Sequence, residues 1–369
     1  MYQRTPAPLR RRTRYPAAPV RADSETFFRD LLEAAGPSGD EREAAAVWRR
    51  YASGFADVHG DALGSCYATV NAEGTRSVAV LGHIDEIGLV VTHIDDEGYL
   101  WFRGVGGWVA AVLVAQRVRI LTKDGPVTGV VGQKAPHLTD QEERDKPLKV
   151  DQLWIDIGAA DGDDARARVQ VGDLAVLEVP IVDLVGSRIA SRAVDNRAGA
   201  FVAAEAARLY AENPGAWKLV GVGSVGEETS FSGAYTSAFG LDPDAALIID
   251  VTHTSDQPNV PKRKVGEIKL GGGPVIERGS GVHPVMFDLI GEVAKAEGIP
   301  VQFGASSGST GTDADAVKLS RAGIRCGVVS VPNRYMHSPN EIVDLDDLEA
   351  VAALIAAVSR RLDDLPAVS

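Results

Sequence analysis

The chain has 369 residues, of which 45% are hydrophobic and 24% charged, and its net charge at pH 7 is −13. These values exclude a disordered or fibrous protein and suit a globular chain long enough for two domains. The acidic balance argues against nucleic acid and anionic membrane as partners, and no apolar stretch reaches the roughly 18 residues of a membrane span.

The beginning of the chain has a different composition. Residues 1–22 hold six arginines and no acidic side chain, without the apolar core of a secretory signal. We expect residues 1–23 to be a disordered basic tail.

Two cysteines, Cys66 and Cys326, lie far apart in strand-like stretches. We expect buried free thiols rather than a disulfide or a metal-ligand pair. A reducing, cytoplasmic location fits this composition best.

Helix and strand patterns begin after the tail. Ser24 precedes an amphipathic stretch and is a typical helix cap, so a helix is predicted there, and a second is predicted from Asp40 onward. Strand patterns follow at residues 66–71 and 77–82.

The pattern changes between Gly88 and Pro180, where strand-like runs recur with turn signals between them. The predicted strands cover residues 89–94, 99–103, 116–121, 127–131, 154–157 and 174–179. We therefore predict a small inserted all-β domain at 88–180, with a polar loop at 134–149.

Strands and helices alternate after Pro180. The predicted helices cover residues 198–212, 232–239, 285–297, 315–321 and 344–362, and the predicted strands cover 189–194, 218–225, 245–251 and 325–331. This alternation is typical of an α/β domain with a wound sheet flanked by helices. That domain would consist of residues 24–87 and 181–369, and the glycine-rich stretch 304–311 would be either a mobile wall of a cleft or an ordinary turn.

Polar side chains with metal-binding or acid–base capacity follow the predicted strands. In wound sheets, ligands bind outside the carboxyl ends of the strands. The residues at these positions are His83, Asp85, Asp195, Glu227, Glu228, Asp250 and His337. Taken singly, each has a more ordinary explanation, such as a strand-end cap or a solvated helix face. Their shared position favours a common site.

The adjacent glutamates Glu227 and Glu228 need a partner of opposite charge, because neighbouring carboxylates repel and lose hydration at the edge of a core. Zinc and cobalt accept histidine nitrogen and carboxylate oxygen, and paired ions need a bridging carboxylate. We predict two donor sets that share one residue. They are His83, Asp195 and Asp250 for one ion, and Asp195, Glu228 and His337 for the other.

Acid–base roles follow from this arrangement. Glu227 would remain free to act as the general base toward a shared water, and Asp85 would orient the His83 imidazole. Of the other histidines, His253 and His283 could line a substrate cleft, although a loop position is the simpler interpretation. The remaining three, His59, His93 and His137, lack a strand-end position.

Six motifs resemble one known family. They are His83-Ile-Asp-Glu-Ile-Gly88, Val194-Asp-Asn-Arg-Ala-Gly199, Gly226-Glu-Glu228, Asp250-Val-Thr-His253, Gly308-Ser-Thr-Gly-Thr-Asp-Ala-Asp315 and Arg334-Tyr-Met-His-Ser-Pro339. Their order is similar to that of the glutamyl, or tetrahedral (TET), aminopeptidases, two-metal metallopeptidases whose members are sometimes described as endoglucanases. Two departures are the arginine-rich start and Gly226, where a glutamine is frequent.

The resemblance implies a catalytic α/β domain with two zinc or cobalt ions per subunit and an inserted β domain used in dimerisation. It also implies homo-oligomers, commonly dodecamers built from dimers, that trim peptides from a free N-terminus. The implied metal ligands are His83, Asp195, Glu228, Asp250 and His337, with Glu227 as the base and Asp85 as the orienting residue.

Other functions stay open on the sequence alone. A two-metal carboxypeptidase or deacylase would use the same constellation but needs a basic group for a substrate carboxylate, for which Arg103, Arg197 and Arg334 are candidates. A glycosidase is disfavoured because its paired carboxylates work without histidine ligands. A non-enzymatic assembly protein on the same fold would not need the complete ligand set.

Overall fold

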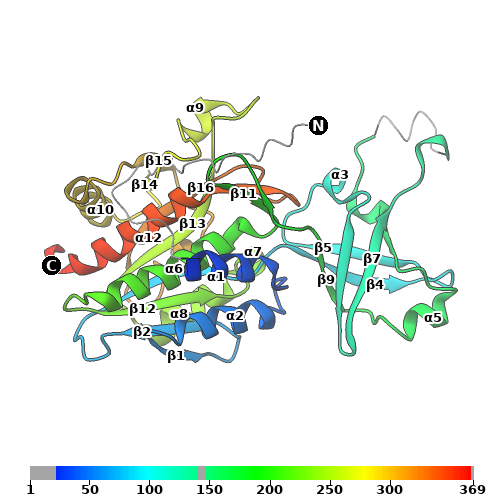
Figure 1. Cartoon of the computed structure of the whole chain (residues 1–369), viewed down its shortest axis with the longest axis horizontal. Helices are drawn as coiled ribbons and strands as arrows, with labels where there is room; N and C mark the ends of the chain where they lie inside the picture. Colours follow the sequence, from blue (N-terminus) through cyan, green and yellow to red (C-terminus); the bar gives the residue numbers. More distant parts are fainter. Residues whose placement is uncertain (1–21, 139–145, 367–369) are drawn as a thin grey trace, which may run out of the picture.

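The computed structural model describes residues 22–138 and 146–366, which are organised around one large sheet (Figure 1). Its hydrogen-bonded strand order is β1-β2-β12-β3-β13-β16-β14-β15. In chain order these strands are β1 (Asp57–Gly60), β2 (Cys66–Val70), β3 (Ser77–His83), β12 (Lys218–Ser224), β13 (Ala245–His253), β14 (Val275–Gly279), β15 (Gln302–Ser306) and β16 (Arg325–Asn333).

The centre of this sheet is parallel, because β12, β3, β13 and β16 all run in the same direction. Every residue of β3 is buried, which explains why its sequence is continuously apolar until His83. A strand covered on both faces needs apolar side chains on both. β2 and β14 run antiparallel to their central neighbours, so the sheet is mixed.

Helices cover both faces of the sheet. The helices of the described residues are α1 (Ala22–Glu33), α2 (Arg42–Ala52), α3 (Ala110–Leu113), α5 (Gly162–Arg166), α6 (Val194–Glu212), α7 (Glu227–Ser230), α8 (Ser232–Leu241), α9 (Lys262–Val265), α10 (Pro284–Glu297), α11 (Ala314–Val317) and α12 (Leu345–Arg360). The long helices α1, α2, α6, α10 and α12 share one hydrophobic core, and α8 and α11 pack on the opposite face.

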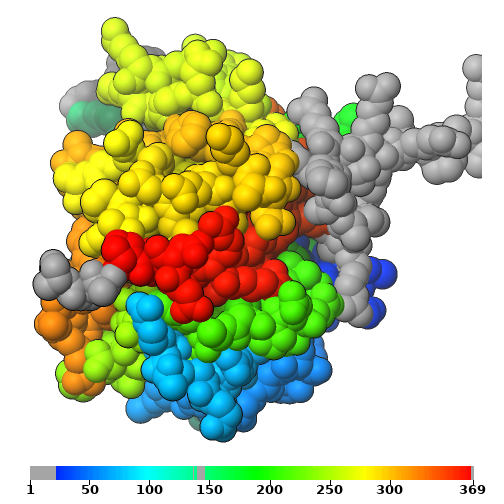
Figure 2. Space-filling view, turned by 90° about the vertical axis from the view of Figure 1, so that its left-hand side faces the viewer, coloured from blue at the N-terminus to red at the C-terminus, as the bar shows by residue number. Residues whose placement is uncertain are grey.

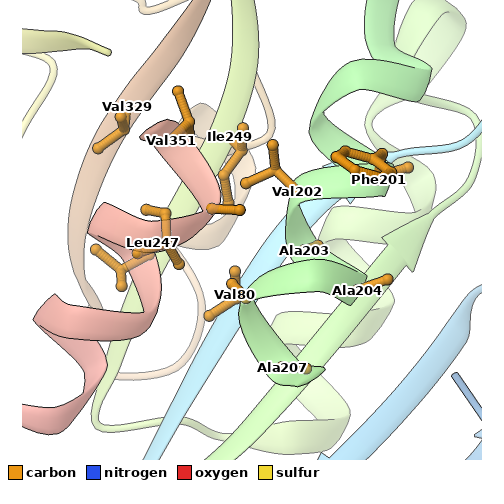
Figure 3. Packing of buried hydrophobic residues seen from close by; sticks show 14 of the residues in the cluster. Val80, Phe201, Val202, Ala203, Ala204, Ala207, Leu247, Ile249, Val329 and Val351 are labelled. Atoms are coloured by element: carbon orange, nitrogen blue, oxygen red, sulfur yellow. The ribbon is translucent and has the colours of Figure 1, made fainter. Parts of the chain in front are cut away.

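The alanine-rich helix α6 forms the middle of the larger core. Its small side chains allow close packing on the sheet, and Figure 3 shows Val202 and Ala203 facing Val80 and Ile249. Helix α12 contacts both α6 and α10, and the space-filling view shows it as a red band between them (Figure 2). This packing holds the central strands rigidly, and with them the residues at their ends.

A closed barrel stands beside the large sheet, at the right of Figure 1, with strand order β4-β5-β8-β7-β6-β9. Its strands are β4 (Gly88–Ile94), β5 (Leu100–Val105), β6 (Arg117–Thr122), β7 (Gly125–Gly132), β8 (Trp154–Asp156) and β9 (Leu174–Leu177). Its interior is filled by a separate apolar cluster that includes Leu89, Phe102 and Ile120. The predicted fold class, a wound α/β sheet flanked by helices with a small all-β part, is confirmed.

A third, small sheet corrects one prediction. It consists of β10 (Val182–Asp183), β11 (Arg188–Ser191) and β17 (Glu341–Asp344). The predicted strand at 189–194 therefore ends early and does not belong to the large sheet. Ala193 adopts a left-handed φ of +58° and turns the chain into α6, so Asp195 lies at the start of a helix rather than at the end of a strand.

Other boundaries also differ from the prediction. Helix α1 begins at Ala22, so Ser24 lies inside the helix, and the last two residues of the expected tail are helical. Residues 1–21 lie outside the described residues, as does the central part of the expected loop at 134–149. The helix expected at 315–321 is only the short α11, because its last turn tightens and Arg321 takes a left-handed φ of +52°. Strand β15 occupies the first half of the glycine-rich stretch at 304–311.

The cysteines behave as predicted. Cys66 and Cys326 are free and buried, and burial raises the pKa of their thiols to about 11 and about 12. Both thiols therefore stay protonated at neutral pH. Across the described ranges, no helix combines the length and apolar character needed to cross a membrane.

Replacing Phe201 with alanine should lower the free energy of unfolding by about 3–5 kcal/mol, because the side chain is fully buried and leaves a cavity. Its ring centre lies 5.0 Å from that of Phe28 and 5.8 Å from that of Phe27. Urea unfolding at one fixed protein concentration checks this expectation. The control Leu63→Ala removes a side chain that is 49% exposed, and equal losses for the two variants would contradict the core assignment.

Candidate active site

The carboxyl ends of the four central parallel strands meet at one edge of the sheet, and the predicted site residues gather there. His83 is the last residue of β3, and Asp250 lies near the end of β13. Glu227 and Glu228 open α7, which begins three residues beyond the end of β12, and His337 lies four residues beyond β16. Asp195 reaches the same place from the start of α6.

The structure groups these side chains into sets that could hold a cation. Within each set, one donor atom per residue lies within 4.8 Å of the others. The sets are His83, Asp195 and Asp250; Asp195, Glu228 and His337; and His83, Glu227 and Glu228. The first two are the sets predicted from the sequence.

Asp195 is common to two sets and divides its oxygens between them. Its Oδ1 lies 3.3 Å from Nε2 of His83, and its Oδ2 lies 3.4 Å from Nε2 of His337. A carboxylate that is shared by two donor sets could bind a cation through each of its oxygens.

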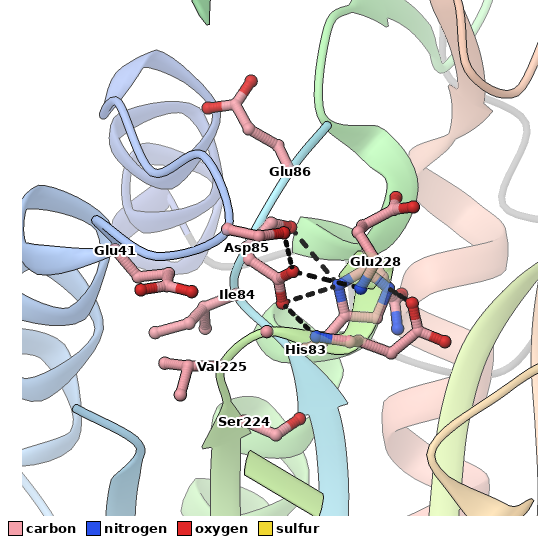
Figure 4. Close-up of polar contacts among 12 residues, drawn as sticks. Glu41, His83, Ile84, Asp85, Glu86, Ser224, Val225 and Glu228 are labelled. Carbon is pink, nitrogen blue, oxygen red and sulfur yellow. Dashed lines mark hydrogen bonds and ion pairs between the residues drawn. The ribbon is translucent and has the colours of Figure 1, made fainter. Parts of the chain in front are cut away.

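Asp85 connects three parts of the site (Figure 4). Its Oδ1 lies 3.3 Å from Nδ1 of His83, so the Nε2 atom of His83 is directed toward Asp195. The same carboxylate accepts hydrogen bonds from the backbone N–H groups of Glu227 at 3.1 Å and Glu228 at 3.2 Å. Gly226, at a φ of +67°, turns the end of the strand into the first turn of α7. Backbone N–H groups in a first helical turn have no acceptor within the helix, so these two can donate to Asp85. Asp85 is fully buried and therefore fixes the imidazole and the glutamate pair together.

Glu341 has a comparable function on the other side, and the sequence did not single it out. Its Oε2 accepts the backbone N–H of Asp195 at 2.7 Å, and its Oε1 accepts that of His337 at 2.9 Å. The side chain is 2% exposed and comes from β17. The one available signal was its position four residues after His337.

Asp313 is a second residue that was missed. It is 2% exposed, accepts a hydrogen bond from the Ser224 hydroxyl, and has one oxygen without a hydrogen-bond partner among the described residues. Burial raises the pKa of Asp313 to about 6. Its negative charge also helps to raise the pKa of Glu227.

The electrostatics of the cluster show an excess of negative charge. Burial, with the neighbouring carboxylates, raises the pKa of Glu227 to about 8 and that of Asp250 well above its ordinary range. The Asp195 and Glu228 carboxylates raise the pKa of His337 to about 11. Burial by itself would raise the pKa of Asp195, but hydrogen bonds from the two imidazoles lower that pKa well below its ordinary range. These carboxylates would be stabilised by added positive charge.

Divalent ions fit this donor set. Oε1 of Glu228 is buried and has no hydrogen-bond partner among the described residues, which is costly for a carboxylate unless it binds a cation. Imidazole nitrogen and carboxylate oxygen are the ligand types of zinc and cobalt sites.

The barrel contributes a wall of the site through the loop after β5. A Cβ atom at Gly107 would lie 3.2 Å from Nδ1 of His337, and one at Gly106 would lie 3.4 Å from Oε2 of Glu228 and collide with Ile87 at 2.4 Å. Glycine therefore permits the barrel loop to pass close to His337 and Ile87, beside Glu228.

The arginines considered as carboxylate receptors are engaged elsewhere or exposed. Arg197 is fully buried and donates to Glu86 and to the carbonyl groups of Leu31, Ala34 and Ile84. Arg334 pairs with Asp256 at 2.7 Å, and Arg103 is exposed on the barrel strand β5. None of these three arginines is therefore placed to receive a substrate carboxylate at the cluster.

Comparison with known proteins identifies relatives over most of the chain. The family model for M42 glutamyl aminopeptidase matches residues 64–354. The lysyl aminopeptidase of Pyrococcus furiosus is 35% identical over 305 residues, covering 82% of this chain and 86% of the relative.

Solved structures agree. A TET aminopeptidase from a marine sediment archaeon of the Thaumarchaeota has a TM-score of 0.88 at 34% identity, covering 92% of this chain and 96% of that one. The TET1 peptidase of Pyrococcus horikoshii has a TM-score of 0.80 at 30% identity, covering 91% of this chain and 99% of that one. That peptidase can assemble into a tetrahedron or a large octahedral shell.

These matches define the class of protein as a metal-dependent peptidase, an enzyme that hydrolyses peptides. More narrowly, the chain belongs to the M42 glutamyl aminopeptidase family. The resemblance noted in the sequence motifs is confirmed.

Replacing Glu341 with glutamine should weaken zinc binding by about 10- to 100-fold, the usual effect of disturbing residues that orient ligands. Both carboxylate oxygens accept backbone N–H groups, and a glutamine amide nitrogen cannot replace either of them. Competition with a chelating dye measures the affinity. The matched control is Glu267→Gln, because the Glu267 side chain is 72% exposed. Unchanged zinc affinity in both variants would contradict an orienting role for Glu341.

Proposed function

We propose that the chain is a two-metal aminopeptidase that removes residues from peptides with a free N-terminus. Zinc or cobalt would be held by His83, Asp195, Glu228, Asp250 and His337. The observation that carries this proposal is the division of the Asp195 oxygens between His83 and His337, each at 3.3–3.4 Å. That division places two donor sets side by side at the strand ends.

When bound, paired ions supply an acidified water and stabilise negative charge on the substrate carbonyl. Glu227 is the proposed general base. Its Oε2 lies 3.6 Å from Nε2 of His83, and its side chain is 10% exposed, so it faces the cluster while remaining reachable from solvent. The carboxylate takes a proton from the attacking water and gives it to the leaving amine.

The protonation state of Glu227 depends on its neighbours. Burial and nearby carboxylates raise its pKa to about 8, whereas positive charge beside it would favour the anion and lower that pKa. A filled site would therefore hold Glu227 in the basic form at neutral pH.

The excess of carboxylates also supports an exopeptidase that acts on free amines. The free α-amine of a substrate could be held by one of these carboxylates through a charge-assisted hydrogen bond. A panel of aminoacyl chromogenic substrates, free and N-blocked, separates these classes: cleavage of the unblocked compounds alone is expected.

Oligomeric assembly is part of the proposal. A structural relative assembles into a tetrahedron or an octahedral shell, and we propose that this chain forms dimers through the inserted β segment at 88–180 and then dodecamers. The catalytic part would be residues 24–87 and 181–369. Light scattering coupled to size exclusion should give a mass of about twelve chains of 39.0 kDa. A monomeric mass at micromolar concentration would contradict it. The cytoplasmic location stays a prediction from the sequence.

Replacing Glu227 with glutamine should lower kcat by at least about 100-fold, the usual contribution of a general base, while metal content stays unchanged. The glutamine side chain keeps the shape but cannot accept the proton. Elemental analysis of the purified variant measures the metal, and hydrolysis of a free aminoacyl substrate measures the rate. If the variant instead loses metal, Glu227 is a ligand.

Removing metal with a chelator should abolish turnover, and adding zinc or cobalt should restore it, because the proposed nucleophile depends on the ions. Rates measured during titration with each metal check the expectation. Full activity after exhaustive chelation, with metal absent by elemental analysis, would contradict the two-metal mechanism.

A further inference from the structure

A cavity of about 630 Å³ begins beside the cluster of candidate metal ligands. It is lined by Val251 and Ser330, among others. Val251 follows Asp250 in β13, and Ser330 is the residue of β16 that lies opposite Asp250 in the parallel register. The backbone of Ser330 therefore lies one strand spacing, about 4.8 Å, from that of a proposed metal ligand.

More of the residues that line the cavity are polar or charged than apolar. The apolar ones include Val265, Ile268 and Ala305. The segment Lys262–Gly266, which includes α9, forms another side. His253 also lines this cavity.

Glu277 is an acidic side chain in this cavity and comes from β14, two strands away from β13. It is half-buried, and within the described residues it has no hydrogen-bond or ion-pair partner. Loss of hydration raises the pKa of Glu277. A carboxylate that is partly withdrawn from water and unpaired is costly, and a cation entering the cavity would offset that cost.

The backbone next to Glu277 is shaped around its carboxylate. Gly304 of β15 lies opposite Glu277 in the parallel register, and a Cβ atom at Gly304 would collide with the carboxylate oxygens. Two residues further along β15, the hydroxyl of Ser306 is buried and has no hydrogen-bond partner among the described residues. The cavity thus offers a carboxylate and a hydroxyl as unused acceptors.

We propose that this cavity receives the side chain of the substrate's N-terminal residue, and that Glu277 makes the enzyme prefer lysine or arginine there. The inference rests on the proposed aminopeptidase function. The apolar residues of the lining would contact the methylene stem, and Glu277 would bind the charged head group through a charge-assisted hydrogen bond.

Basic residues at the mouth of the cavity could instead attract an acidic side chain. Lys262, Arg263 and Lys264 are all exposed, and Lys262 already lies 3.4 Å from Glu267. Exposed charges are screened by water, whereas a charge withdrawn from water interacts more strongly with its partner. Glu277 would also repel an acidic side chain that reached the floor of the cavity. The half-buried carboxylate therefore decides the preference.

The test compares kcat/KM for lysyl, norleucyl and glutamyl amides of one fluorogenic amine, using the metal-loaded full chain. Norleucine has an apolar chain of similar length to that of lysine but no charge. The wild-type enzyme should prefer lysine to norleucine by about 10- to 100-fold, the value of a hydrogen bond to a charged group. In Glu277→Gln that ratio should fall to near one.

The control variant is Glu267→Gln, which removes an exposed carboxylate from the neighbouring segment and should leave the ratio unchanged. Inhibition by free lysine, compared with free norleucine, gives a binding readout that does not depend on turnover. Thermal unfolding shows whether Glu277→Gln is folded.

Each outcome has one meaning. A lysine preference that persists in folded Glu277→Gln overturns the inference, as does a wild-type preference for glutamyl substrate that Arg263→Gln removes. If the wild-type enzyme cleaves the norleucyl amide as fast as the lysyl amide, the specificity proposal fails but the aminopeptidase proposal stands. If it cleaves none of the three free aminoacyl amides, the proposed function itself fails.

Discussion

Repulsion among buried carboxylates is the constraint on which this structure depends. Asp195, Asp250, Glu227 and Glu228 converge with two imidazoles at one edge of the sheet, and their raised or strongly lowered pKa values report the crowding. Such a cluster is stable only if its members are held rigidly and their charge is compensated. The fold supplies the rigidity, through parallel strands packed between helices. The donor atoms are arranged so that cations can supply the compensation.

Two further carboxylates organise the cluster by hydrogen bonding to the backbone. Asp85 joins the end of β3 to the turn after β12, and Glu341 joins the start of α6 to the segment after β16. Asp85 therefore fixes the proposed base Glu227 together with proposed ligands, and Glu341 fixes two proposed ligands. In both cases these residues come from different parts of the chain. Because both are buried, their bonds are protected from competition with water.

The same sheet edge would link the proposed chemistry to the proposed selection of substrate. Strand β13 carries Asp250 and then continues into the cavity wall, and β16 and β14 carry the wall onward to Glu277. On the other side, the glycine pair after β5 brings the barrel against Glu228 and His337. A substrate side chain and the reacting bond can thus be held by one continuous, rigid framework, which is the arrangement that catalysis by positioning requires.

The sequence by itself determined the fold class and the residues of the candidate site, because both leave local signals. Fully apolar runs such as the one before His83 identify strands buried on both faces, and polar residues after such runs mark the binding edge. Asp195 was recognised for its chemistry although its predicted strand was wrong, since a left-handed residue at Ala193 diverts the chain into α6. Only the tertiary structure drew attention to Glu341, Asp313 and Glu277. A carboxylate with a structural role differs from a solvated one in the backbone N–H groups that it accepts and in the hydration that it loses. Both depend on contacts between strands and loops that are distant in the sequence.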